Sequence, residues 1–450
     1  MIKTFFKDSN IDLDRIKVIN TPNCIYVDGY FFPEDEKCPI CNSSDLQKNG
    51  HIKRTVKHCV YYSSLILVTC HFQLYCCKNC NHKFQEKNTF SPPNISLSYE
   101  SIFAILEKLQ DPTNSFESIA KDMHISRQNV LDVFDKFYTY SPSDDLPEIM
   151  SFDEKHIGKA ISDHKYLFII LDWKQKKIYN ILESRDKKTI WNYFSSISRE
   201  KRLKVKYITM DMWETYRDVS KVMFPNAKIA VDSFHVMQNV NRAMNKVRCS
   251  IMAKYNEKTE NLEDNNIYYY FLKKYDYFFT MEFDKIPSYS IKVPKLKTTM
   301  YKSEIIKFLL SIDDRLALAY KLTSKYREFN KTANFQNCSA ELEELIDLFI
   351  NSKLDDFIKV GRTLINWKNE IINSFITIDE CLTIPNTKDE IPVPRRLSNG
   401  PIEGINSIIE QIKINGKGYK NFKRFKYRVI YAINKDLTIN GKKVKLYRTN

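Results

Sequence analysis

Three acidic residues occupy positions from which their carboxylates could meet. Asp153 lies inside an apolar stretch that predicts a β-strand, and Asp211 ends a second such stretch. Glu403 follows the turn-forming pair Gly400-Pro401, which predicts that it lies in the first turn of a helix. Carboxylates contributed by two strands and a late helix can converge on divalent metal ions, and such sites cut and join phosphodiester bonds.

Two neighbouring residues extend this candidate site. Asp232 also ends an apolar strand and begins a helix, and His235 follows it. We expect this pair to support the site by orienting a ligand or by touching DNA. The alternative is a helix cap at Asp232 with His235 packed beneath it. Glu154 adjoins Asp153, but strand alternation places the two on opposite faces, so only one can point at the metals.

Four cysteines predict a separate zinc site near the N-terminus. Cys38 and Cys41 form one C-x2-C pair, and Cys77 and Cys80 form a second after a β-rich insert. Each pair makes a tight knuckle that offers two thiolates on one side, and two knuckles complete a tetrahedral zinc site. The insert suits a zinc ribbon with an enlarged loop. Cys76 could replace Cys77 as a ligand, although the flanking residues favour Cys77.

The elements that must position the carboxylates follow an α/β pattern. The expected strands are residues 150–157, 166–172, 177–182, 205–211 and 228–232, and the expected helices are 189–198 and 216–224. Three hairpin strands, a helix, a strand, a helix and a strand are the element order of the ribonuclease-H-like fold, with a mixed five-stranded sheet. In that fold Asp153 would lie in the middle of strand one and Asp211 at the tip of strand four.

The expected catalytic domain is split by a long helical region. Its first part is residues 146–245, and its second part, residues 394–450, carries the Glu403 helix and a basic tail. Residues 246–393 are expected to be helical and too long for a loop, which predicts an α-helical insertion domain. Phosphate contacts in the basic tail are expected from Lys413, Lys417, Lys420, Lys423 and Arg424.

Two smaller domains are expected before the catalytic region. Residues 1–95 form an N-terminal arm and zinc-binding domain, and residues 96–145 have three-helix periodicity that resembles a helix-turn-helix. Ser115 and Ser118 would cap the middle helix and Ser126 the last one. A plain three-helix bundle is the alternative. The candidate contacts to base edges are Arg127, Gln128 and Asn129.

Composition narrows the classes of partner and compartment. The chain has 450 residues and a formal net charge of +15, which favours a polyanionic partner such as nucleic acid, although a general lysine bias is an alternative explanation. The first ten residues meet an acid before any apolar run, and no stretch approaches the roughly 20 apolar residues of a membrane span. We expect a cytoplasmic protein whose eleven cysteines are reduced.

Over essentially its whole length the chain resembles the DDE transposases of bacterial insertion sequences, and most of all their ISL-three family. The cysteine pairs and the helix-turn-helix fit this family. The other matching segments are Ser151–Glu154, Thr209–Trp213, Val231–Val236, Ser398–Asn406 and Gly418–Phe425.

The resemblance implies a catalytic triad of Asp153, Asp211 and Glu403 that binds Mg²⁺ or Mn²⁺. It implies binding to the terminal inverted repeats of an insertion sequence, followed by DNA strand cleavage and transfer into target DNA. A homodimer or higher oligomer is expected because two ends must be joined, and the expected location is the bacterial nucleoid. The alternatives are a catalytically silent, transposase-derived DNA-binding regulator and a structure-selective ribonuclease-H-like nuclease.

Overall fold

A computed structural model describes residues 12–443, except for 13–14, 23, 31–35, 62–63, 89, 159–160, 256–261, 283–284, 384–389, 436–437 and 440–441. The first eleven residues of the expected N-terminal arm lie outside this range. The chain divides into two compact units. Unit 1 comprises residues 1–141, 157–163 and 406–450, and unit 2 comprises residues 142–156 and 164–405.

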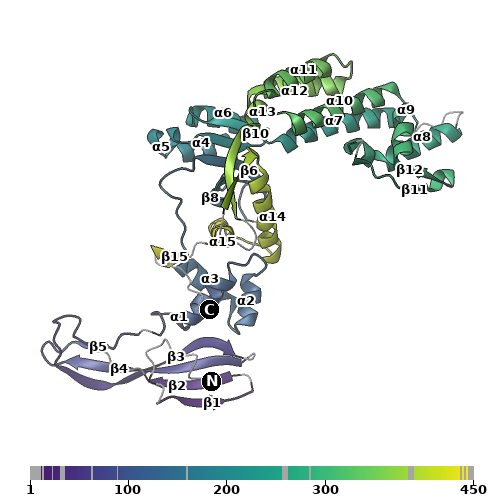
Figure 1. Cartoon of the computed structure of the whole chain (residues 1–450). Coiled ribbons are helices and arrows are strands. Elements are labelled where there is room, and N and C mark those ends of the chain that lie inside the picture. Colours follow the sequence, from purple (N-terminus) through teal and green to yellow (C-terminus); the bar gives the residue numbers. More distant parts are fainter. Residues whose placement is uncertain are drawn as a thin grey trace. The chain divides into compact units, whose positions relative to one another are not determined.

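Unit 1 contains a five-stranded sheet in its N-terminal part (Figure 1). Its strands are β1 (Lys17–Asn20), β2 (Cys24–Tyr30), β3 (Leu46–Tyr61), β4 (Ser64–Cys77) and β5 (Lys83–Gln85). Strands β3 and β4 form a long antiparallel hairpin, β2 runs parallel to β4, and β5 pairs with the end of β4. The buried residues alternate along β2, so the sheet has one apolar face.

Four helices lie wholly within the described part of unit 1. They are α1 (Tyr99–Lys108), α2 (Phe116–Asp122), α3 (Arg127–Phe137) and α15 (Phe422–Asn434), followed by the short strands β15 (Thr438–Ile439) and β16 (Lys442–Lys443). The expected caps are confirmed, because the Ser115 hydroxyl accepts from Ser118 N–H and that of Ser126 accepts from Asn129 N–H. Helix α15 packs against α1 and α3. The ring of Tyr431 contacts that of Phe134 on α3 and lies 4.5 Å from that of Tyr138 at an angle of 58°. Its hydroxyl donates to a carbonyl of α1.

Unit 2 is built around the expected mixed sheet. Its strands are β6 (Ile149–His156), β7 (Tyr166–Asp172), β8 (Lys177–Leu182), β9 (Tyr207–Met210) and β10 (Lys228–Val231). They are ordered β10-β9-β6-β7-β8. The pairs β6–β7 and β7–β8 are antiparallel, whereas β6–β9 and β9–β10 are parallel. The intervening helices are α4 (Lys187–Ser195), α5 (Arg199–Leu203) and α6 (Glu214–Met223), so the predicted order of elements is confirmed.

The two faces of this sheet bury different partners. On one face Phe152, Ile208 and Met210 pack with apolar residues of α4 and α6. On the opposite face a smaller cluster joins Ile149 to Leu397, which lies in the segment before the late helix α14 (Gly400–Asn415). Alternation along the strands therefore turns odd-numbered residues of β6 and β9 toward the segment that starts α14.

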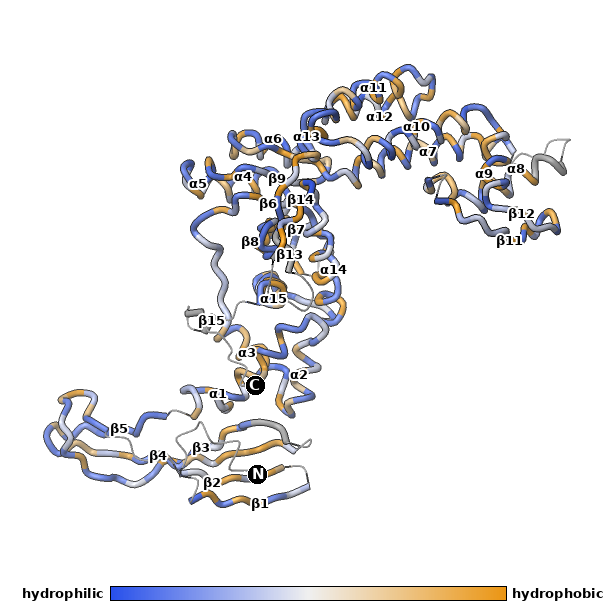
Figure 2. Tube along the Cα trace, viewed as in Figure 1, coloured by the Kyte–Doolittle hydropathy of each residue, from blue (hydrophilic) through white to orange (hydrophobic). Residues whose placement is uncertain are grey.

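The helical part of unit 2 is larger than its sheet. Its helices are α7 (Ser233–Lys254), α8 (Leu262–Lys274), α9 (Lys302–Ser311), α10 (Asp314–Thr332), α11 (Cys338–Ile350), α12 (Asp355–Asn366) and α13 (Lys368–Asn373). Two 3-10 helices, η2 (Asp276–Thr280) and η4 (Pro294–Leu296), accompany them. Figure 2 shows hydrophobic and hydrophilic residues alternating along α7 and α10, as expected of helices that bury one face.

Two β-hairpins in this region were not predicted. They are β11 (Ser290–Val293) with β12 (Thr298–Tyr301), and β13 (Thr377–Thr383) with β14 (Glu390–Arg396). The second hairpin leads directly into the turn before α14. Where the structure describes the chain, none of its helices combines the length and the apolar character that a membrane crossing requires.

Candidate active site and cysteine cluster

The two cysteine knuckles of unit 1 have the same backbone geometry. In each, the N–H of an asparagine one residue past the second cysteine donates to the carbonyl of the first cysteine, at 2.9 Å. Asn42 and Asn81 both adopt φ of 57°, in the left-handed region that asparagine tolerates better than most residues. This turn folds each C-x2-C pair so that both thiols leave on one side.

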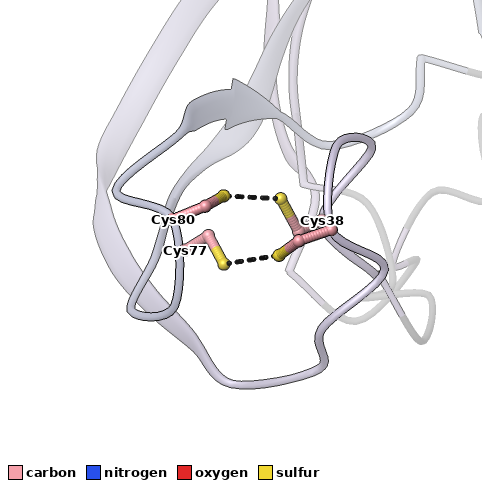
Figure 3. Close-up of side chains that lie close together, drawn as sticks. Cys38, Cys77 and Cys80 are labelled. Atoms are coloured by element: carbon pink, nitrogen blue, oxygen red, sulfur yellow. Dashed lines mark hydrogen bonds between the residues drawn. The ribbon is translucent and has the colours of Figure 1, made fainter.

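The four cysteine sulfurs converge on one point. Cys38 Sγ lies 3.4 Å from Cys80 Sγ, and Cys41 Sγ lies 3.4 Å from Cys77 Sγ. All four sulfurs lie within 4.8 Å of one another, and Figure 3 shows the labelled side chains pointing together. Sulfurs around a tetrahedral zinc ion are about 3.8 Å apart, given a Zn–S distance of about 2.3 Å. The cluster therefore could hold a metal ion such as zinc, and Cys76 is outside it.

The thiols of the first knuckle differ in acidity. The backbone N–H of Cys41 makes the largest contribution to lowering the pKa of Cys38, to about 6, while burial opposes that shift. The backbone N–H of Ser43 lowers the pKa of Cys41, but the hydrogen bond with Cys77 and burial outweigh it, so that the pKa of Cys41 is raised. Thiolates are the form that binds zinc, and Cys38 is the thiol of this knuckle that deprotonates more readily.

In unit 2 the register of the sheet brings Asp153 and Asp211 side by side. Ser151 pairs with Thr209 and Phe152 pairs with Met210 across β6 and β9. The next position along both strands is occupied by the two aspartates, and adjacent strands lie about 4.8 Å apart. Both acids follow the odd-numbered alternation, so they belong to the face that meets the start of α14.

Asp211 lies in a strongly carboxylate-rich environment. Burial raises its pKa, to about 7, while the amide of Asn399 opposes that shift, and the charges of Asp232, Glu154 and Glu403 raise the pKa further. The electrostatic effect of Glu403 shows that the late helix brings its carboxylate into range of Asp211. A divalent cation would relieve the repulsion among these groups, so this donor set fits hard cations with oxygen ligands.

Glu403 occupies the first turn of α14, as predicted from the Gly-Pro turn. The carbonyl of Asn399 accepts from the backbone N–H groups of Ile402 and Glu403, at 3.0 and 3.2 Å. The Glu403 side chain is exposed, whereas Asp153 is only 8% exposed. Within the described residues the cysteines alone place three or more ligand atoms within 4.8 Å of one another. The three acids thus share an edge of the fold without closing on a single point.

Asp232 is a helix cap, as one of the two interpretations expected, and His235 lies beside Asp211. Asp232 caps α7, since its Oδ1 accepts from Phe234 N–H at 2.7 Å, and its Oδ2 accepts from Asn399 N–H at 2.7 Å. His235 Nε2 lies 3.1 Å from Asp211 Oδ2. The pair therefore joins β10, α7 and the start of α14 to the carboxylate of Asp211.

Glu154 is engaged on the opposite face of the sheet. It forms an ion pair with Arg185, and Tyr216 donates from its hydroxyl to Glu154 Oε2 at 3.1 Å. The Arg185 guanidinium also stacks over the rings of Tyr166 and Trp213, at 4.0 and 4.5 Å from their centroids. These partners give Glu154 a structural role and leave Asp153 as the acid of β6 that faces α14.

Three polar residues beside the acids were missed by sequence analysis. Ser151, Thr209 and Asn399 are all buried and are connected by hydrogen bonds that end on Asp211 Oδ1. A serine and a threonine within apolar strands carry no distinctive spacing. All three lie in segments that match the family, Ser151–Glu154, Thr209–Trp213 and Ser398–Asn406, but the turn before Gly400-Pro401 alone explains an asparagine at 399.

The candidate DNA contacts differ in exposure. Arg127 and Gln128 are exposed at the start of α3, whereas Asn129 accepts from Ser126 Oγ in the cap of that helix. In the basic tail Arg424 pairs with Asp135, and Lys413 pairs with Glu410. The tail residues that remain exposed are Lys417, Lys420 and Lys423.

Comparison with known proteins identifies the family of the chain. No curated protein matches the chain significantly. A family model described as transposase, that of the ISL-three family of DDE transposases, matches residues 150–429. This match includes the sheet of unit 2, its helical region, Glu403 and most of α15. Because it covers more than half of the sequence, the chain belongs to the ISL-three family of transposases.

Proposed function

We propose that this protein is an active DDE transposase that binds the terminal inverted repeats of its insertion sequence and catalyses metal-dependent DNA cleavage and strand transfer. The observation that carries the proposal is the register of β6 and β9, in which Asp153 and Asp211 each follow the last paired residues, Phe152 and Met210. Glu403 lies within electrostatic range of Asp211. These are the three acids that the family resemblance selects.

The sheet supports a ribonuclease-H-like catalytic domain. The order β10-β9-β6-β7-β8, with the first three strands parallel and the last two antiparallel to their neighbours, has the connectivity expected for that fold. Asp153 lies on the central strand of this sheet and Asp211 directly after the neighbouring strand. Helix α14 returns Glu403 to the same edge after the long helical region, which we interpret as an insertion.

Metal ions are required by the charge of this site. Three carboxylates close to a phosphodiester would repel it, and no lysine or arginine among the described residues is found hydrogen-bonded to Asp211 to offset that charge. Asp153, Asp211 and Glu403 would hold Mg²⁺ or Mn²⁺, which when bound activates the attacking hydroxyl group and stabilises the leaving 3′-oxygen.

Residues of the protein position the carboxylates that would bind the metal ions. Burial holds Asp153 on a rigid strand, whereas the exposed Glu403 has rotational freedom to complete the site when metal and DNA arrive. His235 and Asn399 each hold one oxygen of Asp211. Positioning of this kind contributes most of the rate when the reaction is an in-line displacement at phosphorus.

DNA recognition is assigned to unit 1. We interpret α2 and α3 as a helix-turn-helix in which Arg127 and Gln128 face base edges, with Asn129 supporting the cap of α3. Lys417, Lys420 and Lys423 would contact phosphates. Zn²⁺ in the cysteine cluster would stabilise the β3–β4 hairpin as part of the same DNA-binding region.

Two ends and a target must meet in one reaction, so the active assembly is proposed to be a homodimer or a larger oligomer on double-stranded DNA. A catalytically silent regulator would tolerate loss of the acids, yet all three are present at one edge of the sheet. A structure-selective nuclease would not need exposed base-reading residues such as Arg127 and Gln128.

The experiment that tests the proposal is cleavage and joining of end DNA by purified protein with and without Mg²⁺. Asp153→Asn and Asp211→Asn should abolish both steps and leave end binding intact. Asp172→Asn is the matched control, because Asp172 lies on the neighbouring strand β7 opposite Met150, at the other end of β6. Metal-independent cleavage, or full activity of Asp153→Asn, would refute the proposal.

A further inference from the structure

Both N–H donors of the Asn399 side chain are used inside the protein. Asn399 is 1% exposed. Its Nδ2 donates to the carbonyl of Phe152 at 3.1 Å and to Asp211 Oδ1 at 3.1 Å, and its Oδ1 accepts from Thr209 Oγ1 at 2.7 Å. A side-chain amide has two N–H donors and an oxygen that can accept, and each of these groups has a partner here. The side chain is therefore buried and engaged with the protein.

The orientation of this amide follows from its partners. The Phe152 carbonyl can only accept, so the nitrogen of the amide must face it and the oxygen must face Thr209. The single hydroxyl proton of Thr209 then goes to Asn399. Since Ser151 Oγ lies 2.7 Å from Thr209 Oγ1, the proton between those hydroxyls comes from Ser151. The hydrogen bonds run in one direction, from Ser151 through Thr209 and Asn399 to Asp211.

This series of hydrogen bonds connects the elements that carry the candidate acids. Ser151 lies on β6 two residues before Asp153, and Thr209 lies on β9 two residues before Asp211. Asn399 precedes α14, and its own carbonyl accepts the N–H of Glu403. Its backbone N–H donates to Asp232 Oδ2, which fixes the turn against the cap of α7. One buried asparagine thus contacts β6, β9, α7 and the start of the Glu403 helix.

We propose that Asn399 is a positioning residue, whose amide, oriented by Ser151 and Thr209, fixes the rotation of the Asp211 carboxylate and keeps Glu403 in register with it. This inference rests on the proposed function, because it assigns Asp211 and Glu403 as metal ligands. With Asn399 on Oδ1 and His235 on Oδ2, the carboxylate of Asp211 is held at both oxygens. Groups that orient a ligand in this way commonly change metal affinity 10- to 100-fold when they are replaced.

Other residues at position 399 could not do this. Aspartate would lose both donors and add a carboxylate between Asp211 and Asp232. Leucine would remove the donor to the Phe152 carbonyl and to Asp211 and the acceptor of the Thr209 hydroxyl. The choice of asparagine is therefore dictated by the donors and acceptors around it, beyond the needs of a turn.

The test uses the full-length, zinc-loaded protein and the isosteric variant Thr209→Val, which removes the hydroxyl that orients the amide. Mn²⁺ binding is followed by water-proton relaxation, and cleavage of end DNA is measured against Mn²⁺ concentration. Thr209→Val and Asn399→Ala should weaken Mn²⁺ binding at least 10-fold and raise the Mn²⁺ concentration for half-maximal cleavage by a similar factor. Thr209→Ser keeps the hydroxyl and should restore both values to within about threefold.

A matched control separates positioning from stability. Asn180 is a buried asparagine of β8 whose Oδ1 accepts from the N–H of Ile181, outside the chain of hydrogen bonds. Asn180→Ala should lower thermal stability without changing the Mn²⁺ requirement. If Asn399→Ala does not fold, Thr209→Val decides the question. If Thr209→Val does not fold either, Ser151→Ala is used in its place, because it removes only the first donor.

The outcomes distinguish this inference from the function on which it rests. Wild-type Mn²⁺ affinity in folded Thr209→Val would overturn the positioning role while leaving the transposase proposal intact. Retained metal-dependent cleavage in Asp153→Asn would instead overturn the triad itself. A loss in Thr209→Val that Thr209→Ser does not restore would also count against the inference, because the hydroxyl would then not be its cause.

Discussion

The imidazole of His235 lies 3.1 Å from Asp211 Oδ2, although the two residues belong to different βα units of the sheet. The contact arises because β9 and β10 are parallel neighbours, so the residues that follow them emerge at the same edge. Asp232 ends β10 and caps α7, which places His235 in the first turn of that helix. Asp211 is thereby enclosed by groups from three elements, and burial raises the pKa of its carboxyl.

The first prediction concerns the pH dependence of stability without divalent metal. The pKa of Asp211 is raised from 3.8 to about 7, first by burial. Between these values the folded protein binds a proton that the unfolded chain has released, so the unfolding free energy falls as pH rises from 4 to 7 and then levels. The contribution of this group is at most about 4 kcal/mol.

Urea unfolding of wild type and Asp211→Asn at several pH values isolates this contribution, because other titrating groups are common to both proteins. The stability advantage of wild type should shrink toward pH 7. Adding Mg²⁺, which binds the deprotonated carboxylate, should offset the decline in wild type alone. A difference between the two proteins that is constant across this range would contradict the raised pKa.

The second prediction concerns Glu403. Glu403→Gln keeps the shape of the side chain but removes one negative charge, so metal binding should weaken and cleavage and joining should fall by several orders of magnitude. End-DNA binding should survive, because the residues proposed to read DNA belong to unit 1. Glu410→Gln is the control from the same helix, since Glu410 pairs with Lys413. An inactive Glu410→Gln protein that still binds DNA would reassign the third acid.

The sequence was most informative where periodicity and local turn chemistry determine structure. All five strands and both predicted helices around Asp153 and Asp211 were found close to their expected positions, and the serine caps of α2 and α3 were confirmed. The network around Asn399 could not be predicted, because it depends on register between β6 and β9 and on a turn far away in sequence. The identity of a single residue such as Thr209 does not indicate which distant residues it will contact.

Helix α15 of unit 1 is a second case in which the sequence did not predict the packing of a residue. Its sequence reads as a basic tail, yet Arg428 is fully buried and donates to the carbonyls of Asp111 and Asn114. Burial lowers the pKa of this guanidinium. A count of lysines and arginines cannot distinguish a side chain that faces solvent from one that packs against α1 and the loop after it. In the structure Phe425, Val429 and Ala432 share the buried face of α15 with Arg428.

The third prediction follows from this packing. Tyr431 is buried and donates to the carbonyl of Leu106 at 2.9 Å. Tyr431→Phe should lower the unfolding free energy of unit 1 by about 1 kcal/mol through the lost hydrogen bond. Tyr431→Ala should cost about 3–5 kcal/mol through the cavity and should also impair end-DNA binding. Thermal unfolding and gel-shift assays measure the two effects, and normal DNA binding by unfolded Tyr431→Ala would exclude a role for α15.

The fourth prediction separates sequence reading from charge. Gln128 is exposed on α3, where its Nε2 donates to Asp132 and can exchange that partner for a base edge. Gln128→Ala should reduce the ratio of specific to random DNA binding by a factor that corresponds to about 1–3 kcal/mol. Lys423→Ala should weaken binding to both DNAs and reduce the salt dependence by roughly one counterion. Equal losses on both DNAs in Gln128→Ala would favour the plain three-helix bundle.

The last prediction concerns the cysteine cluster. Purified protein should carry about one zinc per chain, held by the four sulfurs that lie within 4.8 Å of one another. Cys77→Ser removes one of these ligands and should release the metal. Cys76→Ser is the matched control, because Cys76 adjoins Cys77 on β4 but its Sγ lies 4.0 Å from the carbonyl of Asn81, outside the cluster. Metal analysis and chelator release rates measure both variants. Full zinc content in Cys77→Ser together with loss of zinc in Cys76→Ser would show that Cys76, and not Cys77, is the zinc ligand. The second pair of ligands would then have the spacing C-x3-C.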